Sequence, residues 1–261
     1  MTLQRESPNR GEVEVFPTRE ALLAAAAERF AAAAGAAIAA RGRFVVALAG
    51  GATPEGLYAR LAAEPHASRI DWSRVHVFWG DERAVLPGDG ASNYRMAREA
   101  LLDRVPLRPE QIHRIRGEAE PAVAAAAYER ELREAFATPT GPPRTMPGAR
   151  FDLVLLGLGQ DGHTASLFPG AEALHERELW VRAERAPAAP PWRITLTPMV
   201  VNAAAEVVFL VAGRDKAAAL RRVLTEPPQP DLLPAQGIRP TAGSLGWLVD
   251  AAATAELGLG A

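Results

Sequence analysis

Cysteine is absent from this sequence of 261 residues, and so is any excess of basic charge. Without cysteine the chain can form no disulfide framework, no cysteine-ligated zinc or iron–sulfur site, and no thiol nucleophile. Its 29 Lys and Arg residues are balanced by 31 Asp and Glu residues, whereas a general nucleic-acid-binding protein usually carries a basic surplus. The composition therefore argues against a disulfide scaffold, a thiol enzyme and a nucleic-acid partner.

Long hydrophobic runs are missing as well. The first twenty residues are too highly charged for a signal peptide. The longest uncharged apolar run near the N-terminus, residues 30–40, is mostly alanine and too short to span a bilayer. We therefore expect a cytoplasmic protein with no membrane partner.

Lysine is nearly absent, since Lys216 is the only lysine among the 29 basic residues. A GC-rich coding sequence would favour arginine over lysine throughout the chain. Lys216 is then either a compositional accident or a residue that a site requires.

Short apolar runs alternate with helical segments along the chain. Strands are expected at residues 44–49, 75–79, 151–156, 206–212 and 246–250, and helices at 18–40, 54–64, 92–103, 119–137 and 214–224. Continuous apolar strands with helices between them indicate a parallel sheet covered on both faces. We predict one α/β domain over residues 1–261, with three α/β/α layers and a mainly parallel, Rossmann-like central sheet. Residues 80–91, 138–147 and 227–234 are predicted as loops.

Ligands of such sheets bind at the carboxyl ends of the strands, where the first notable turn is Gly50-Gly51-Ala52-Thr53-Pro54. Its glycines allow backbone N–H groups to face a ligand, the following helix adds a positive N-terminus, and Thr53 adds a hydroxyl. The spacing of a nucleotide P-loop is absent. The turn is either a phosphate cradle or an ordinary tight connection.

The second notable segment, Asp81-Glu82-Arg83, follows an apolar strand directly. Charged residues at the carboxyl end of a strand favour a binding site, although exposed charges are also common in loops. We therefore treat Asp81 and Arg83 as candidate binding residues.

The third notable segment is Gly157-Leu-Gly-Gln-Asp161-Gly-His163-Thr164. Its glycines match a dinucleotide fingerprint weakly, because the break at Pro169-Gly170 leaves little room for the long helix of that motif. Asp161, two residues before His163, could orient the imidazole and raise its basicity. A general base, a nicotinamide site and an ordinary surface histidine all remain open. No metal-ligand spacing and no nucleophile elbow occur.

Several segments in order resemble the 6-phosphogluconolactonases, whose relatives are the glucosamine-6-phosphate deaminases. The resemblance covers most of residues 43–250 and rests on Ala47–Pro54, Phe78–Arg83 with Ser92-Asn93-Tyr94, Gly157–Pro169, Arg193–Thr197 with Asn202, Gly213-x-x-Lys216, and Leu233-Pro234 through Arg239-Pro240. The resemblance implies hydrolysis of 6-phospho-D-glucono-1,5-lactone, a step of the oxidative pentose phosphate pathway.

The resemblance also implies roles for individual residues. His163 would be the general base, Asp161 would orient it or contact the sugar, and Asp81 would bind sugar hydroxyls. The phosphate-binding residues would be Gly50, Gly51, Thr53, Arg83 and Lys216, with Arg193 as a weaker candidate. No metal or organic cofactor is expected, because a lactone is already an activated ester. The expected partner is a small phosphosugar lactone, and the chain is expected to be a monomer or a weak oligomer.

The alternative within the same resemblance is a sugar-phosphate isomerase or deaminase. In the deaminases the corresponding loop carries a glutamate five residues after the histidine, whereas this sequence has Phe168 there. Phenylalanine supplies no acid or base for ring opening and proton transfer between carbons. The residue favours the lactonase.

Overall fold

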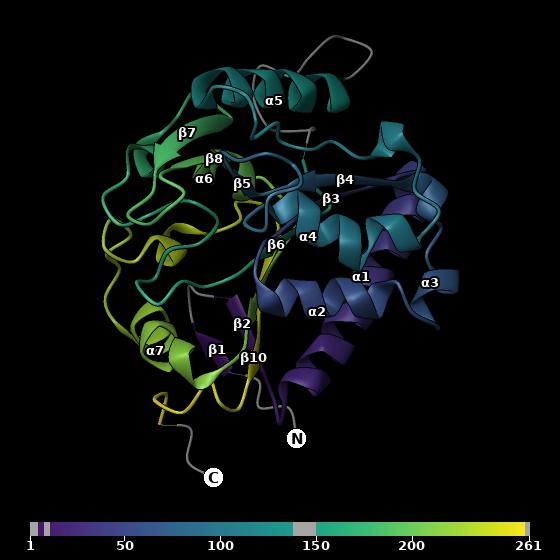
Figure 1. Cartoon of the computed structure of the whole chain (residues 1–261). Helices are drawn as coiled ribbons and strands as arrows, with labels where there is room; N and C mark the ends of the chain where they lie inside the picture. The colour runs from purple at the N-terminus through teal and green to yellow at the C-terminus, as the bar shows by residue number, and fades with distance from the viewer. Residues whose placement is uncertain (1–4, 8–10, 138–149, 259–261) are drawn as a thin grey trace.

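A seven-stranded sheet forms the middle layer of the protein (Figure 1), whose computed structural model describes residues 5–7, 11–137 and 150–258. The strand order is β1-β2-β10-β9-β6-β3-β4. β1 is antiparallel to β2, and all other neighbouring strands of this sheet are parallel. The strands are β1 (Arg5–Ser7), β2 (Gly11–Phe16), β3 (Phe44–Leu48), β4 (Val75–Trp79), β6 (Leu153–Leu156), β9 (Glu206–Val211) and β10 (Ser244–Asp250). The predicted, mainly parallel sheet is confirmed.

Helices cover both faces of this sheet. Figure 1 shows α1 and α2 on one side of it and α5 and α7 on the other, which confirms the three-layer α/β/α architecture. The α-helices are α1 (Arg19–Arg41), α2 (Ala52–Leu61), α3 (His66–Arg69), α4 (Asn93–Ala100), α5 (Pro121–Ala135), α6 (Pro198–Val201) and α7 (Ala217–Thr225). The 3₁₀ helices are η1 (Trp72–Arg74), η2 (Leu102–Arg104), η3 (Pro109–Gln111), η4 (Glu172–His175), η5 (Arg214–Lys216) and η6 (Pro234–Gly237). The loop predicted at 138–147 lies outside the described residues.

Burial explains why the central strands read as apolar runs. All five residues of β3 and all four of β6 are buried, as expected for strands covered on both faces. The 23-residue helix α1 begins at the predicted cap, where the Thr18 hydroxyl accepts a hydrogen bond from the Ala21 N–H at 3.2 Å. By length and composition α1 could also cross a membrane, but here its Leu22 and Phe30 are buried in the core.

A second, three-stranded sheet is not predicted by the sequence. It consists of β5 (Asp81–Arg83), β8 (Trp192–Leu196) and β7 (Val181–Arg185), paired antiparallel in that order. The prediction of an uninterrupted loop over residues 80–91 is therefore wrong at β5. The three strands are short and carry charged residues, so they lack the apolar runs of the central sheet.

The predicted helix boundaries are close, with one instructive error. α2 begins at Ala52, with Gly51 as its N-cap, and not at the predicted Pro54. Proline fits inside a first helical turn because the N–H groups there have no helical partner in any case. The glycine turn is thereby shorter than expected and passes directly into the helix.

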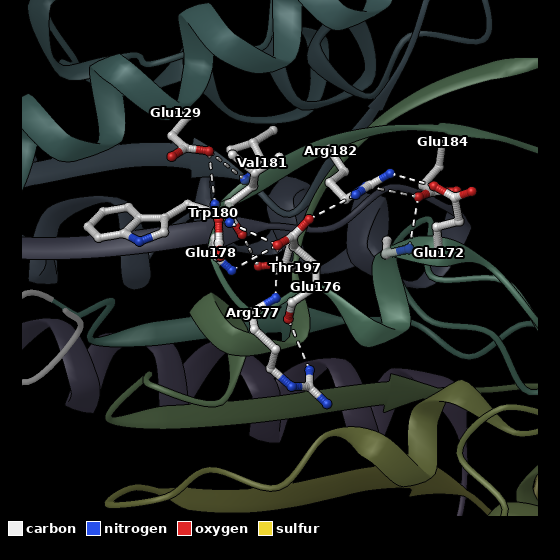
Figure 2. A network of polar contacts seen from close by, with 12 residues as sticks. Glu129, Glu172, Glu176, Arg177, Glu178, Trp180, Val181, Arg182, Glu184 and Thr197 are labelled. Atoms are coloured by element: carbon white, nitrogen blue, oxygen red, sulfur yellow. Dashed lines mark hydrogen bonds and ion pairs between the residues drawn. The ribbon is translucent and has the colours of Figure 1, made fainter. Parts of the chain in front are cut away.

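A carboxylate holds the segment that leads into the second sheet (Figure 2). Glu176 accepts hydrogen bonds from the backbone N–H groups of Arg177 and Glu178, both at 2.8 Å, and from that of Leu179 at 3.1 Å. The Arg182 guanidinium reaches the same carboxylate at 2.8 Å. These donors, the Glu178 N–H foremost and Arg182 next, lower the pKa of Glu176 to about 2. The turn before β7, and with it the β7–β8 hairpin, is thereby fixed in place.

Candidate active site

The carboxyl ends of β3, β6, β9 and β10 meet at one edge of the central sheet because these strands are parallel. The turn after β3, residues 50–54 (the cradle), lines a cavity of about 470 Å³ there (the cradle cavity). Gly50, Gly51 and Thr53 share this cavity with Lys216, which ends η5 after β9. The fold thus gathers the glycine turn and the one lysine of the chain.

A second cavity, of about 490 Å³, holds the other predicted site residues (the histidine cavity). It is lined by Asp81, Arg83, Asp161, His163 and Arg193. Lys216 also lines this cavity, so the same side chain borders both spaces. The predicted residues are therefore divided between two cavities that adjoin at Lys216, with Arg83 on the histidine side.

His163 and Asp161 form a close pair. Asp161 Oδ1 lies 2.5 Å from His163 Nδ1 and accepts a hydrogen bond from the His163 backbone N–H at 3.0 Å. Burial by itself would raise the pKa of Asp161, but the His163 N–H and the imidazole outweigh it and lower that pKa. A carboxylate beside Nδ1 accepts a hydrogen bond from the Nδ1–H group, so the proton stays on Nδ1 and the lone pair is on Nε2. Any side chain at Gly159 would collide with this imidazole.

Asp81 belongs to a buried polar network. Its Oδ2 accepts a hydrogen bond from the Ser166 hydroxyl at 2.6 Å, and its Oδ1 accepts one from the Asn93 amide at 3.2 Å. The same amide packs so closely on Gly50 that a side chain there would collide with it. Ser166 and Asn93 connect the three loops that the sequence singles out. Sequence reasoning missed both roles, although both residues lie inside the motifs that carry the resemblance.

Glu82 serves a different purpose from its neighbour Asp81. It is buried, and it accepts hydrogen bonds from the Asn93 and Tyr94 N–H groups at 2.7 Å and from the Ser92 hydroxyl at 2.9 Å. Burial raises the pKa of Glu82 against the lowering effect of these donors. Successive strand residues point to opposite faces, so Asp81 faces the cavity while Glu82 caps α4.

Two arginines lie side by side on neighbouring strands of the second sheet. Arg83 of β5 and Arg193 of β8 are register partners, and Arg193 is only 8% exposed. Arg193 donates to the carbonyls of Pro190 and Trp192, and Arg83 donates to that of Ala91. Burial, followed by the charge of Arg83, lowers the pKa of Arg193. Neither arginine has a carboxylate partner among the described residues, so together they form a site for an anion.

Neither a metal site nor a dinucleotide-binding helix accompanies these residues in the part of the chain that the structure describes. Among the residues that the structure describes, no group of three or more His, Asp or Glu side chains could hold a metal ion. No helix begins within residues 157–171, all of which are described. The fingerprint glycines therefore lack the helix whose N-terminus would face a pyrophosphate.

The sequence profile described as "Glucosamine-6-phosphate isomerases/6-phosphogluconolactonase" matches residues 17–247. The chain belongs to this family. A relative from Nostoc sp. named 6-phosphogluconolactonase is 43% identical, over 94% of this chain and 98% of its own length. The solved 6-phosphogluconolactonase from Trypanosoma cruzi has a TM-score of 0.81 and 27% identity, covering 94% of this chain and 96% of that one. These findings confirm the resemblance drawn from the sequence.

The family also contains enzymes of the second kind. A monomeric glucosamine-6-phosphate deaminase has a TM-score of 0.77 at 20% identity, over 94% of this chain and 99% of its own, a likeness that shows the shared fold alone. In the present member of the family, the ring of Phe168 lies 4.8 Å from that of His163, between centroids. An apolar ring therefore borders the histidine.

Proposed function

We propose that this chain hydrolyses 6-phospho-D-glucono-1,5-lactone to 6-phospho-D-gluconate in the oxidative pentose phosphate pathway. The observation that carries the proposal is the His163–Asp161 pair, in a cavity that adjoins a glycine cradle through one lysine. Relatives that match 80%, 84% and 94% of this chain bear the name of this activity. A base and an anion site side by side suit a phosphorylated ester.

The substrate's phosphate would lie where the two cavities adjoin. Backbone N–H groups of Gly50, Gly51 and Thr53 at the start of α2 would donate to it from one side. Lys216 would contribute charge between the cavities, and Arg83 with Arg193 would contribute it from the histidine side. Planar guanidinium groups suit phosphate oxygens because they donate two parallel hydrogen bonds.

The lactone ring would then extend toward His163. His163 Nε2 takes a proton from water as the water oxygen attacks C1, and the proton returns to the ring oxygen as the C1–O bond breaks. Asp161 keeps Nδ1 protonated and stabilises the imidazolium that forms in between. Asp81, held by Ser166 and Asn93, would accept hydrogen bonds from the sugar hydroxyls. General-base catalysis of this kind is typically worth ~10²–10⁴-fold in rate.

Phe168 argues for hydrolysis over deamination. Isomerisation with loss of ammonia needs a further acid–base group beside the histidine, and the apolar ring of Phe168 borders His163 at the sequence position where the resemblance implies a glutamate in the deaminases. The lactonase needs only an activated water and a polarised carbonyl. The proposal includes no metal and no organic cofactor, a cytoplasmic location, and a monomer or weak oligomer.

Two assays side by side test the proposal. The purified protein is given fresh 6-phosphogluconolactone, with the rate corrected for spontaneous hydrolysis, and separately glucosamine 6-phosphate. We expect rapid hydrolysis of the lactone and no release of ammonium. Ammonium release would overturn the proposal in favour of the deaminase, and an unaccelerated lactone reaction would overturn it outright.

A further inference from the structure

Arg19 lines the cradle cavity although it lies far from the cradle in sequence. It is the first residue of α1, which follows β2, and β2 runs parallel to β10, so its carboxyl end lies at the same sheet edge. The Arg19 Nη2 donates a hydrogen bond to the carbonyl oxygen of Ala52, inside the cradle. Arg19 therefore touches the backbone whose N–H groups would bind the phosphate.

Four charged side chains line this cavity, the cations Arg19 and Lys216 and the acids Asp215 and Asp250. Lys216 forms an ion pair with Asp215, in which its Nζ lies 3.5 Å from Oδ2. Asp250 accepts hydrogen bonds from the Gly213 N–H with both carboxylate oxygens, each at 3.1 Å. Arg19 forms no ion pair with any described residue, and its Nε is buried without a hydrogen-bond partner. Arg19 is thus the cation of this cavity that has no ion-paired acid among the described residues.

The position of Arg19 in its helix points the same way. An N-terminal first turn carries the positive end of the helix dipole, which favours acidic residues and disfavours cations. α1 has Glu20 in this turn, as that preference predicts, yet Arg19 begins the helix. A bound anion in the cradle would compensate both the arginine and the helix end. Helix stability alone does not account for an arginine here.

We propose that Arg19 is a specificity residue for the phosphate group of the substrate, a phosphomonoester dianion. Its guanidinium holds the Ala52 carbonyl and supplies the positive charge that Lys216, paired with Asp215, does not supply alone. The inference rests on the proposed lactonase function for its substrate. It adds a residue from α1 to a site otherwise built from the strand-to-helix loops.

Arg19→Gln tests the charge with a side chain that can still donate to a carbonyl. A charge-assisted hydrogen bond to phosphate corresponds to roughly tenfold to hundredfold in affinity. We therefore expect KM for 6-phosphogluconolactone and the inhibition constant of inorganic phosphate each to rise by about that factor. For unphosphorylated glucono-1,5-lactone, kcat/KM should stay unchanged. Arg19→Lys, which keeps the charge but not the planar fork, should recover part of the loss.

Arg60→Gln is the matched control. Arg60 is an exposed arginine in the last turn of α2 and lines neither cavity. Arg60→Gln changes the net charge by the same amount as Arg19→Gln. It should leave kcat/KM for both lactones and the inhibition constant of phosphate unchanged. The melting temperature of Arg19→Gln should equal or exceed that of wild type, because a cation leaves a helix N-terminus. An unchanged phosphate inhibition constant, or an equal loss for both lactones, would overturn the role of Arg19.

The two proposals fail in different ways. If wild type hydrolyses neither lactone, the lactonase function is wrong. Calorimetric titration with inorganic phosphate still measures the affinity of the cradle for phosphate. Weaker phosphate binding by Arg19→Gln than by wild type and Arg60→Gln then supports Arg19. Equal binding by all three proteins rejects it.

Discussion

Glu176→Gln removes one negative charge from the turn before β7 while keeping the shape of the side chain. The wild-type carboxylate accepts three backbone hydrogen bonds and an ion pair, and its side chain is only 10% exposed. A carboxyl group whose pKa falls from 4.5 to about 2 on folding contributes at most about 3 kcal/mol at neutral pH. Glutamine keeps one acceptor oxygen, and Arg182 keeps its contact with Glu172 at 2.7 Å. We therefore expect a loss of about 2 kcal/mol.

The sign of the pH dependence follows from the lowered pKa. A carboxyl that is more acidic in the folded chain stabilises it fully above pH 4.5, and the contribution disappears as the pH falls toward 2. Urea unfolding at pH 7, 5, 4 and 3 would measure it. The difference between wild type and Glu176→Gln should be nearly constant from pH 7 to 5 and shrink by about 2 kcal/mol, close to zero, near pH 3.

Glu110→Gln provides the control for this experiment. Glu110 is 77% exposed and lies 3.9 Å from Arg108, so its removal should change stability by less than about 0.5 kcal/mol. A loss in Glu176→Gln that stayed the same at pH 7 and pH 3 would refute the reasoning. The effect would then come from packing, and the charge would play no part.

Three further predictions concern titratable or charged groups. His163→Gln should lower kcat for the phosphorylated lactone by ~10²–10⁴-fold with little change in KM, and near wild-type turnover would remove His163 from the mechanism. Lys216→Ala should weaken inhibition by 6-phosphogluconate about tenfold or more and Lys216→Arg should restore part of it, whereas an unchanged constant would make this lysine a compositional accident. Burial, and then the charges of His113, Arg43 and Arg108, lower the pKa of His76. Its stabilising contribution is therefore present above pH 6.5 and lost as the pH falls below it. In His76→Gln the urea concentration at the unfolding midpoint should therefore depend less on pH between pH 7 and 5 than in wild type.

The central sheet could be predicted because its strands are buried on both faces. The five residues of β3 are all apolar and all buried, which is what a continuous apolar run signals. The second sheet could not be predicted by the same signal. β7 reads Val-Arg-Ala-Glu-Arg, in which Arg182 forms ion pairs with Glu172 and Glu176 outside the strand, and Glu184 accepts a hydrogen bond from the Ala173 N–H. Such pairing depends on the tertiary structure, and no local pattern of the sequence encodes it.

The candidate site, like the fold, could be predicted from the sequence only in part. Its turns could be located because parallel strands present their carboxyl ends at one edge. The partition of the residues between two cavities could not be seen, since it depends on the β5–β8 pairing that carries Arg83 and Arg193 to the histidine side. Asn93 and Ser166 were also missed as partners of Asp81, because their hydrogen bonds join separate segments of the chain, 12 and 85 residues away from Asp81. That residues 1–261 form one domain stays a prediction.

The charges around the two cavities explain why a dianion would be selected over a neutral lactone. The four acids that line them already have partners: Asp81 has Ser166 and Asn93, Asp161 has His163, Asp215 has Gln160 and Lys216, and Asp250 has the Gly213 N–H. The three lining arginines, Arg19, Arg83 and Arg193, have no carboxylate ion pair among the described residues. Like charges left uncompensated in a partly buried space destabilise the empty site, and a ligand of opposite charge relieves that cost. We infer that binding of the phosphate group completes this arrangement. The bound phosphate would then hold the lactone beside the histidine that activates water.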